Sequence, residues 1–466
     1  MWAALLLAAT CLLLVLRTAL IIRLHIPINW NEGWNAYHTT DLVMGRPLYR
    51  GSTGFFFNNY PPLSFYIVAA WGWLLGDQML AGRSLSLLAL IGWAWLLALT
   101  AKRLGCRWSE AAFAALLLLA SLFLFNVFNV GVNDPEFLGH VLQALGLFIL
   151  LREPRTPWSL VSCAVLFAAG VFVKHLLIAL PIAAVVWLMV FDRRAAWRLM
   201  AVGSLLAVAG LAASVAMFGP DFLIQLLSPR AYLPARAAAM SAEWVSRVLG
   251  LVLVSAVLAR RYLRDPRVAL ALLYAGLATV LGLALFGGDG VYWNNMFDAE
   301  WALCLTAALA LNRLPAATIE RDTDHRVRLG LVTACLAVPV AMTAMGAQIH
   351  WGSPRYWLDP RWFEAETAAS EIAFIRSQPG PVLCEQLSLC FWAGKPVEAD
   401  FFGLHQRVRR DPSRADELAR QVEARRFAVA QLDIPTQYLG PRFEEAMRQN
   451  YRIDHQNEWG VFWVPK

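Results

Sequence analysis

Residues 83–136 read RSLSLLALIGWAWLLALTAKRLGCRWSEAAFAALLLLASLFLFNVFNVGVNDPE, and their pattern decides the fold. Two apolar stretches, 83–101 and 109–127, are each of helix length. The gap between them carries Lys and Arg, whereas the gap after the second carries Asn, Asp and Glu. Because a helix that crosses a bilayer needs about 20 mostly apolar residues, both stretches are long enough to cross one. The basic gap and the acidic gap are therefore expected on opposite sides of a membrane.

The same alternation continues outward from this stretch, from the first residue to about residue 348. The predicted spans are approximately 2–22, 83–101, 109–127, 136–151, 157–173, 176–191, 199–218, 244–259, 268–286, 296–311 and 329–348. The gaps on one side hold sixteen basic residues: Lys102, Arg103, Arg107, Arg152, Arg155, Arg193, Arg194, Arg198, Arg260, Arg261, Arg264, Arg267, Arg313, Arg321, Arg326 and Arg328. The opposite gaps hold five: Arg46, Arg50, Lys174, Arg230 and Arg236.

Cytoplasmic loops of membrane proteins carry the excess positive charge. The bias therefore predicts a multi-pass protein of the inner (plasma) membrane with about eleven crossings. Its N-terminus is expected in the cytoplasm and its C-terminal part outside.

Residues 60–75 are a further apolar segment that tests this topology. A crossing here would move every later arginine cluster to the outside. The segment is short, begins with Pro61-Pro62 and is rich in aromatic residues. It is predicted to be an interfacial or re-entrant helix, with Trp71 and Trp73 at the level of the lipid headgroups.

The composition agrees with a membrane protein. Of the 466 residues, 59% are hydrophobic and 16% are charged, and the mean hydropathy is +0.51. A soluble protein has closer to about half apolar and about a quarter charged residues. The net charge of +7 would suit nucleic acid, but the basic residues lie in short loops that face anionic headgroups, so that class is excluded. Residues 1–22 lack the features of a cleavable signal peptide and are predicted to be a retained helix.

The composition changes near Ser353, where charged residues become frequent. Strand-like runs at Pro381–Cys384 and Phe427–Leu432 flank a charge-dense, helix-like stretch at 411–425. We predict a transmembrane domain, 1–348, followed by a small extracytoplasmic α/β domain, 349–466.

Two cysteines of this second domain, Cys384 and Cys390, can pair in an oxidising compartment, although their spacing alone leaves the pairing open. No internal repeat is visible in the sequence, which weighs against a transporter because many transporters are built from two related halves.

The first outer loop has a carboxylate, Glu32, between Asn31 and Gly33 and near Trp30 and Trp34. Aromatic rings cover the apolar faces of sugars, while amides and carboxylates bind their hydroxyl groups, so the loop suits a sugar site. The alternative is a solvated loop with a helix N-cap, which composition alone favours because interfacial Trp is common.

The next outer loops hold Asp134 and the pair Lys174-His175. Asp134-Pro135 is either an N-cap followed by Pro in the first turn of a helix, or a carboxylate that faces Glu32 across a cavity. Lys174 stands alone between two apolar runs, so it either extends to the interface or binds a lipid phosphate.

A glycine-rich outer loop at 287–300 contains Asp289, Asn294 and Asn295. Glycines permit a ligand to approach the backbone closely, although capping and a turn explain this loop as well. The histidines and cysteines form none of the usual metal-site spacings, and no nucleotide-binding motif is present, so no metal and no cofactor is predicted.

Several short motifs carry a resemblance to a known family: Asn31-Glu32-Gly33, Tyr37, Gly45-Arg46-Pro47-Leu48-Tyr49 and Asn59-Tyr60-Pro61-Pro62-Leu63. As a set they resemble the GT-C glycosyltransferases, in the protein-mannosyltransferase-like branch that includes the lipid A aminoarabinose transferases. The layout agrees over residues 1 to about 300. The resemblance implies that Glu32 is the essential first-loop acid and Asp134 the acid of the second outer loop.

The chain departs from the family at two places. Asn31 precedes Glu32 where many relatives have paired acids, and Asn59-Tyr60 stands where the lipid A branch often has Lys before Pro-Pro. Phosphate binding is then expected from other cations. The predicted substrate-binding residues are Lys174, His175, Tyr60, Arg83, Asp289, Asn294 and Asn295.

The family implies transfer of a sugar from a polyprenyl-phosphate donor to a lipid, glycan or protein acceptor at the outer face, with inversion. Glu32 is the expected base, Asp134 supports the sugar or the acceptor, and Lys174 and His175 stabilise the phosphate. Some relatives use a metal, but no ligand set here requires one. Two alternatives stay open: a flippase or transporter for a lipid-linked glycan, which predicts polar residues through the membrane, and a non-catalytic scaffold that presents the C-terminal domain.

Overall fold

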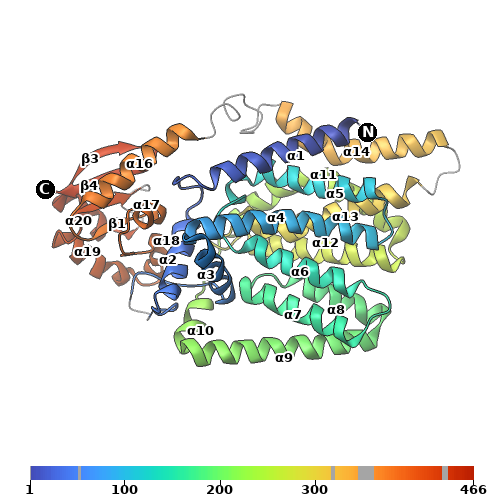
Figure 1. The fold of residues 1–466 in the computed structure, drawn as a ribbon, viewed down its shortest axis with the longest axis horizontal. Coiled ribbons are helices and arrows are strands. Elements are labelled where there is room, and N and C mark those ends of the chain that lie inside the picture. The colour runs from blue at the N-terminus through green and yellow to red at the C-terminus, as the bar shows by residue number, and fades with distance from the viewer. Residues whose placement is uncertain (1, 51–53, 316–320, 345–360, 433–438) are drawn as a thin grey trace.

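A computed structural model describes the whole chain except residues 1, 51–53, 316–320, 345–360 and 433–438. The predicted boundary between the two domains, at 348 and 349, lies outside the described residues. A bundle of long helices makes up most of the molecule, and a small domain with a sheet covers one end of it (Figure 1). The predicted fold class, an α-helical membrane protein with a small C-terminal α/β domain, is confirmed.

The helices of the bundle follow the predicted spans closely. They are α1 (Trp2–Ile21), α4 (Gln78–Arg103), α5 (Trp108–Phe125), α6 (Glu136–Leu150), α7 (Pro157–Val173), α8 (Ala179–Phe191), α9 (Arg193–Phe218), α11 (Pro234–Tyr262), α12 (Pro266–Leu285), α13 (Phe297–Arg313) and α14 (Arg321–Ala344). Within the described residues, five of them are long and apolar enough to cross a membrane: α4, α5, α9, α11 and α12. The total of eleven crossings stays a prediction.

Several helices begin earlier than hydropathy predicts, among them α4, α9, α11 and α14. α9 begins at Arg193 and α11 at Pro234, ahead of the predicted starts at 199 and 244. Arg is a good helix former, so a charged turn extends a helix beyond its apolar part. Asp192 caps α9 by accepting the Ala195 N–H at 3.1 Å.

The core of the bundle is centred on α13. Every residue from Phe297 to Leu311 is buried, and this helix contacts α4, α5, α11, α12 and α14. Its many alanines allow the surrounding helices to approach closely. The outward faces of the peripheral helices are apolar and exposed, as in Leu205 and Val208 of α9, which suits contact with lipid tails.

The arginine-rich turns gather at one end of the bundle, away from the C-terminal domain (Figure 1). Ion pairs join them to one another: Arg155 with Asp192, Arg313 with Asp265, and Arg328 with Glu110. α1 begins at this same end. The arrangement agrees with the predicted sidedness.

The opposite end carries the short elements α2 (Asn31–Val43), α3 (Leu63–Leu75), η1 (Val127–Asn129), α10 (Pro220–Leu226) and η2 (Trp293–Met296). α3 is the segment that tests the topology. Tyr60, just before α3, lies beside Lys174, and Asp77, just after it, lies beside His25 and Trp392. Both ends of α3 therefore lie at this end of the bundle, as expected for a segment that does not cross.

The C-terminal domain is a small sheet covered by helices. Its elements are α16 (Trp362–Ser377), β1 (Val382–Cys384), α17 (Leu387–Trp392), α18 (Phe401–Val408), η5 (Pro412–Ala415), α19 (Asp416–Glu423), β2 (Val429–Leu432), α20 (Pro441–Asn450), β3 (Tyr451–Asn457) and β4 (Gly460–Pro465). The strand order is β1-β2-β4-β3, with β1 and β2 parallel and the other pairs antiparallel. β1, β2 and α19 lie in the predicted segments, while the β3–β4 hairpin was not predicted.

Cys384 and Cys390, whose pairing the sequence left open, form a disulfide. Disulfides persist in oxidising compartments, so this bond agrees with an extracytoplasmic domain.

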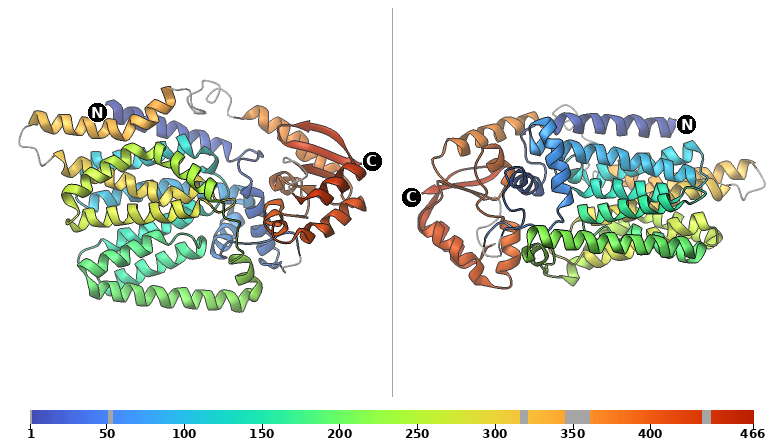
Figure 2. Two further views of the ribbon diagram at one scale, coloured as in Figure 1. Left: turned by 180° about the vertical axis from the view of Figure 1, so that it is seen from behind. Right: turned by 60° about the horizontal axis from the view of Figure 1, so that its bottom comes forward.

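The C-terminal domain covers one end of the bundle (Figure 2), and it docks there mainly through α17, which lies against α2. A Cβ atom on Gly33 would lie 2.3 Å from the Ser388 nitrogen, so only glycine permits this approach. The Tyr37 hydroxyl donates to the Lys395 carbonyl at 2.7 Å, and the Asp400 N–H donates to the Phe55 carbonyl at 2.7 Å. Most of α2 is thus buried between the two domains.

Candidate active site

Glu32, the predicted base, is fully buried at the start of α2 in an ion pair with Arg83 of α4. Its two oxygens accept bonds from Arg83 Nε at 2.7 Å and Nη2 at 2.8 Å. They also accept the N–H groups of Ile28 at 2.8 Å and Asn133 at 3.2 Å. A carboxylate with these partners has no free oxygen that faces a substrate, which argues against its role as a base.

Arg83, a predicted substrate-binding residue, is likewise occupied. Besides Glu32, its guanidinium donates to the carbonyls of Leu24 at 2.7 Å and Ile26 at 2.6 Å. Both side chains of the pair are at most 1% exposed. The geometry gives the pair a structural role: it fixes the end of α1 and the start of α2 relative to α4. The sequence could not indicate this pairing because the two residues are 51 positions apart.

The same network holds the second outer loop in place. Asn35 Nδ2 donates to the Asn133 carbonyl at 2.8 Å, and Asn133 Nδ2 donates to the Glu32 carbonyl at 3.3 Å. Asn133 packs so closely on Gly82 that a Cβ there would meet its side chain at 1.7 Å. Asp134, the next residue, is thereby fixed beside α2 and α3.

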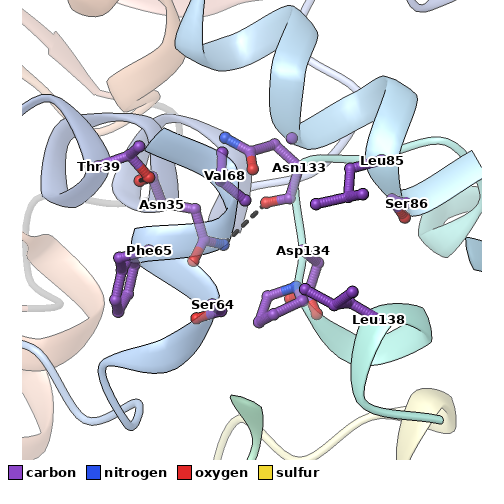
Figure 3. Close-up of a pocket in the computed structure, with 12 residues that line it drawn as sticks. Asn35, Thr39, Ser64, Phe65, Val68, Leu85, Ser86, Asn133, Asp134 and Leu138 are labelled. Carbon is purple, nitrogen blue, oxygen red and sulfur yellow. Dashed lines mark hydrogen bonds between the residues drawn. The ribbon is translucent and has the colours of Figure 1, made fainter. Parts of the chain in front are cut away.

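Asp134 lies on the wall of a cavity between α2, α3, α4 and the start of α6 (Figure 3). The cavity is small, with a volume of about 10 Å³, and Asn35, Ser64 and Asn133 add further polar groups to its lining. Asp134 Oδ1 also accepts the Glu136 N–H at 3.0 Å, so it caps α6 as well as lining the cavity. The cavity does not reach Glu32, so Asp134 does not face Glu32 across it.

Lys174 follows directly after α7, and its side chain lies beside Asp134, which belongs to the preceding outer loop. Its Nζ lies 3.8 Å from Asp134 Oδ1, 5.4 Å from the centre of the Tyr60 ring, and bonds to Glu136. The Lys174 side chain is 8% exposed. Three of the predicted residues, Tyr60, Asp134 and Lys174, are thus neighbours although they come from different loops.

His175 and Tyr60 are both neutral in this cluster. Burial lowers the pKa of His175 to about 4, with the charges of Lys174 and Arg230 acting in the same direction. Burial, followed by the charge of Asp134, raises the pKa of Tyr60 above its ordinary value. His175 therefore offers a hydrogen-bonding group at neutral pH, but no positive charge.

Arg230 is a cation of the site that the predicted set omitted. It precedes α11, and its charge acts on Tyr60, Lys174 and His175. Its Nη1 donates to the Asp289 carbonyl at 3.3 Å, and its guanidinium lies 5.5 Å from the centre of the Phe402 ring. The signal that could have found it was available, because Arg230 is one of the few basic residues in the outer gaps.

Of the three residues predicted in the loop at 287–300, only Asn294 lies in the cluster around Lys174. Asn294 joins the cluster by donating to Glu136 at 2.8 Å. Asn295 instead donates to the Gly282 carbonyl at 2.6 Å, and Asp289 accepts from Gln406 at 2.7 Å and Arg409 at 2.9 Å of the C-terminal domain.

The bonds of Asp289 also set its charge. Burial opposes ionisation of Asp289, but these two hydrogen bonds, together with the charges of Arg409 and His405, outweigh it and lower its pKa. Asp289 therefore ties the domains together and does not line the cavity of Asp134.

Comparison with known proteins agrees with this architecture. Residues 59–220 match the model of the dolichyl-phosphate-mannose-protein mannosyltransferase family. The crystal structure of ArnT from Cupriavidus metallidurans bound to undecaprenyl phosphate has 15% identity and a TM-score of 0.62, covering 99% of this chain and 97% of that chain. Its apo state gives 14% identity, a TM-score of 0.61 and the same coverage. No curated protein matches the sequence.

These comparisons confirm the predicted resemblance to GT-C glycosyltransferases. The shared fold extends over nearly the whole chain. The matched range of the family model contains Tyr60, Asp134 and Lys174 but not Glu32.

Proposed function

We propose that this protein transfers a sugar, with inversion, from a polyprenyl-phosphate donor to a lipid, glycan or protein acceptor at the outer face of the plasma membrane. The observation that carries the proposal is the cluster of Asp134, Lys174 and Tyr60 beside the cavity, where a carboxylate and an ammonium lie 3.8 Å apart. The start of α6 and the end of α7, beside which Asp134 and Lys174 lie, are at the end of the bundle opposite the arginine-rich turns. The charge bias of those turns and the disulfide of the C-terminal domain support its extracytoplasmic position.

Asp134 is the base in this proposal, in place of Glu32. Inversion requires that the acceptor attack the anomeric carbon from the side opposite the phosphate, while a base removes the acceptor proton. Asp134 borders the cavity, whereas both oxygens of Glu32 are occupied. General-base catalysis of this kind contributes about 10²–10⁴-fold to the rate.

Lys174 and Arg230 bind the donor phosphate. Negative charge develops on the phosphate as its bond to the sugar breaks, and fixed cations in a buried site stabilise that charge. Lys174 is almost fully buried, so its attraction to a phosphate is little weakened by water. Neutral His175 adds a hydrogen bond, and the Tyr60 ring covers the Lys174 ammonium.

Glu32 and Arg83 position this site without contacting the reacting atoms. Their pair holds Asn133 through the Glu32 carboxylate and carbonyl, and Asn133 holds Asp134. The apolar outer faces of the bundle helices are suited to the prenyl tail of the donor. The class of donor is inferred from the likeness to ArnT, which was solved with undecaprenyl phosphate.

A transfer assay tests the proposal. Purified full-length protein is incubated with radiolabelled polyprenyl-phosphate sugars, and loss of label from the lipid is followed. We expect Asp134→Asn to lower the turnover rate by about 10²–10⁴-fold. The matched control is Asp192→Asn, because Asp192 also caps a helix but lies at the other end of the bundle. Wild-type turnover by Asp134→Asn would remove Asp134 from the role of base, and no release of label by the wild type would refute the function.

A further inference from the structure

A line of buried polar side chains leads from the proposed site into the interior of the bundle. Lys174 bonds to Glu136, whose Oε1 lies 3.4 Å from His140 Nε2. His140 Nδ1 lies 3.2 Å from Asp298 Oδ1, and Asp298 accepts a hydrogen bond from the Tyr274 hydroxyl. None of these five residues is more than 7% exposed.

The line joins several helices. Glu136 and His140 lie one turn apart on α6, Tyr274 lies near the middle of α12, and Asp298 lies in the first turn of α13. The ring of Trp93 from α4 stacks on His140 at 4.6 Å between ring centres and fixes its orientation. Buried charged groups of this kind are costly in a membrane, and an apolar core would pack as well. The cost of burying these side chains indicates that they have a function.

The charges of the line indicate what that function is. A buried lysine tends to lose its proton, because burial disfavours the charged form. A carboxylate within about 4–6 Å has the opposite effect and favours the ammonium. Lys174 has two such carboxylates, Asp134 at 3.8 Å and Glu136 in direct contact. Glu136 in turn accepts a hydrogen bond from Asn294 at 2.8 Å, and His140 Nε2 lies 3.4 Å from its other oxygen.

We infer that Glu136 and His140 are positioning residues that keep Lys174 protonated and aim its ammonium at the donor phosphate, with Asp298 and Tyr274 holding His140 in place. The inference rests on the proposed function, in which Lys174 binds that phosphate. The titratable and charged groups that face Lys174 are Tyr60, Asp134, Glu136, His175 and Arg230. Of these, only Glu136 connects Lys174 to the interior line.

The test measures binding of polyprenyl phosphate, without sugar, to the purified full chain as a function of pH. Wild-type affinity is expected to fall at alkaline pH as Lys174 loses its proton. In Glu136→Gln the fall should occur at a pH lower by about one unit or more, the usual effect of a neighbouring opposite charge. Tyr274→Phe, the milder variant, should shift the fall in the same direction by less.

The matched control is Tyr262→Phe, because Tyr262 donates its hydroxyl to the Arg313 carbonyl at the far end of the bundle. This control should bind with the wild-type pH dependence. If Glu136→Gln and Tyr274→Phe lower affinity by the same factor at every pH, with the alkaline fall unmoved, the residues are merely structural and the inference is overturned. Such a result would leave the proposed function intact.

A second measurement separates the inference from the function. Without lipid, the melting temperatures of Lys174→Met, Glu136→Gln and the double variant are compared. If the two residues are coupled, the double variant loses much less melting temperature than the sum of the losses of the two single variants. If the wild type binds no polyprenyl phosphate, the proposed function fails. If the losses in melting temperature are also additive, the pairing of Glu136 with Lys174 is overturned as well. Strong coupling in that case would still support Glu136 as the residue that holds Lys174 charged.

Discussion

Replacement of Arg83 by methionine tests the structural role that the geometry gives to the Glu32–Arg83 pair. The guanidinium makes two bonds to Glu32, of 2.7 and 2.8 Å, and further bonds to the carbonyls of Leu24 and Ile26. Both charged side chains are at most 1% exposed. Removing one partner of a buried ion pair leaves an uncompensated charge and costs about 3–5 kcal/mol. We therefore expect Arg83→Met to lower the free energy of unfolding by about 4 kcal/mol.

The assay is chemical denaturation of the purified protein in detergent, followed by tryptophan fluorescence. The control is Arg46→Met, which removes another arginine of the outer face that pairs with a buried carboxylate, Asp41. The Arg46 side chain is 54% exposed and 3.5 Å from Asp41, so its loss should cost no more than about 1 kcal/mol. Adding Glu32→Leu to Arg83→Met should recover part of the loss, because it removes the stranded charge. A loss for Arg83→Met no larger than that of the control would refute the reasoning.

Three further predictions follow from other contacts. Arg230→Gln should raise KM for the donor more than it lowers kcat, because its charge acts from the edge of the Lys174 cluster; an unchanged KM would exclude Arg230 from phosphate binding. Burial opposes protonation of His455, but the carboxylates of Asp454 and Glu371, each at 2.9 Å, outweigh it and raise its pKa. The His455 contribution to stability is therefore fully present below the unfolded pKa of about 6.5 and is lost as pH rises through the higher folded pKa, so melting curves from pH 6 to 9 should show a decline that His455→Gln removes. Gly33→Ala should destabilise the docking of the two domains by about 1–3 kcal/mol, because the added Cβ would lie 2.3 Å from the backbone of α17, and a wild-type melting temperature would contradict this contact.

The sequence predicted the helices of the bundle well because hydropathy is a local signal. Predicted and observed ends agree within a few residues for α1 and α7. They disagree at α11, where a polar first part continues the helix toward the outer end. The β3–β4 hairpin was missed because its strands are half exposed and partly charged, as in Arg452 and Asp454.

The candidate site was predicted only in part. Asp134, Lys174 and Tyr60 were named from their positions in separate loops, but their proximity depends on how α3, α6 and α7 pack, which no local pattern states. Glu32 was assigned as the base because the family resemblance points to a first-loop acid. Its partner Arg83 is distant in the sequence, so the ion pair that occupies its oxygens became visible only in the structure.

Photo-crosslinking of a polyprenyl-phosphate sugar to the purified full chain tests the central claim most directly. Peptides are mapped by mass spectrometry after irradiation of a donor that carries the reactive group next to its phosphate. The account predicts labelled peptides that contain Tyr60, Lys174 or Arg230, with labelling reduced in Lys174→Met. Labelling confined to the arginine-rich turns, at the other end of the bundle, would contradict it.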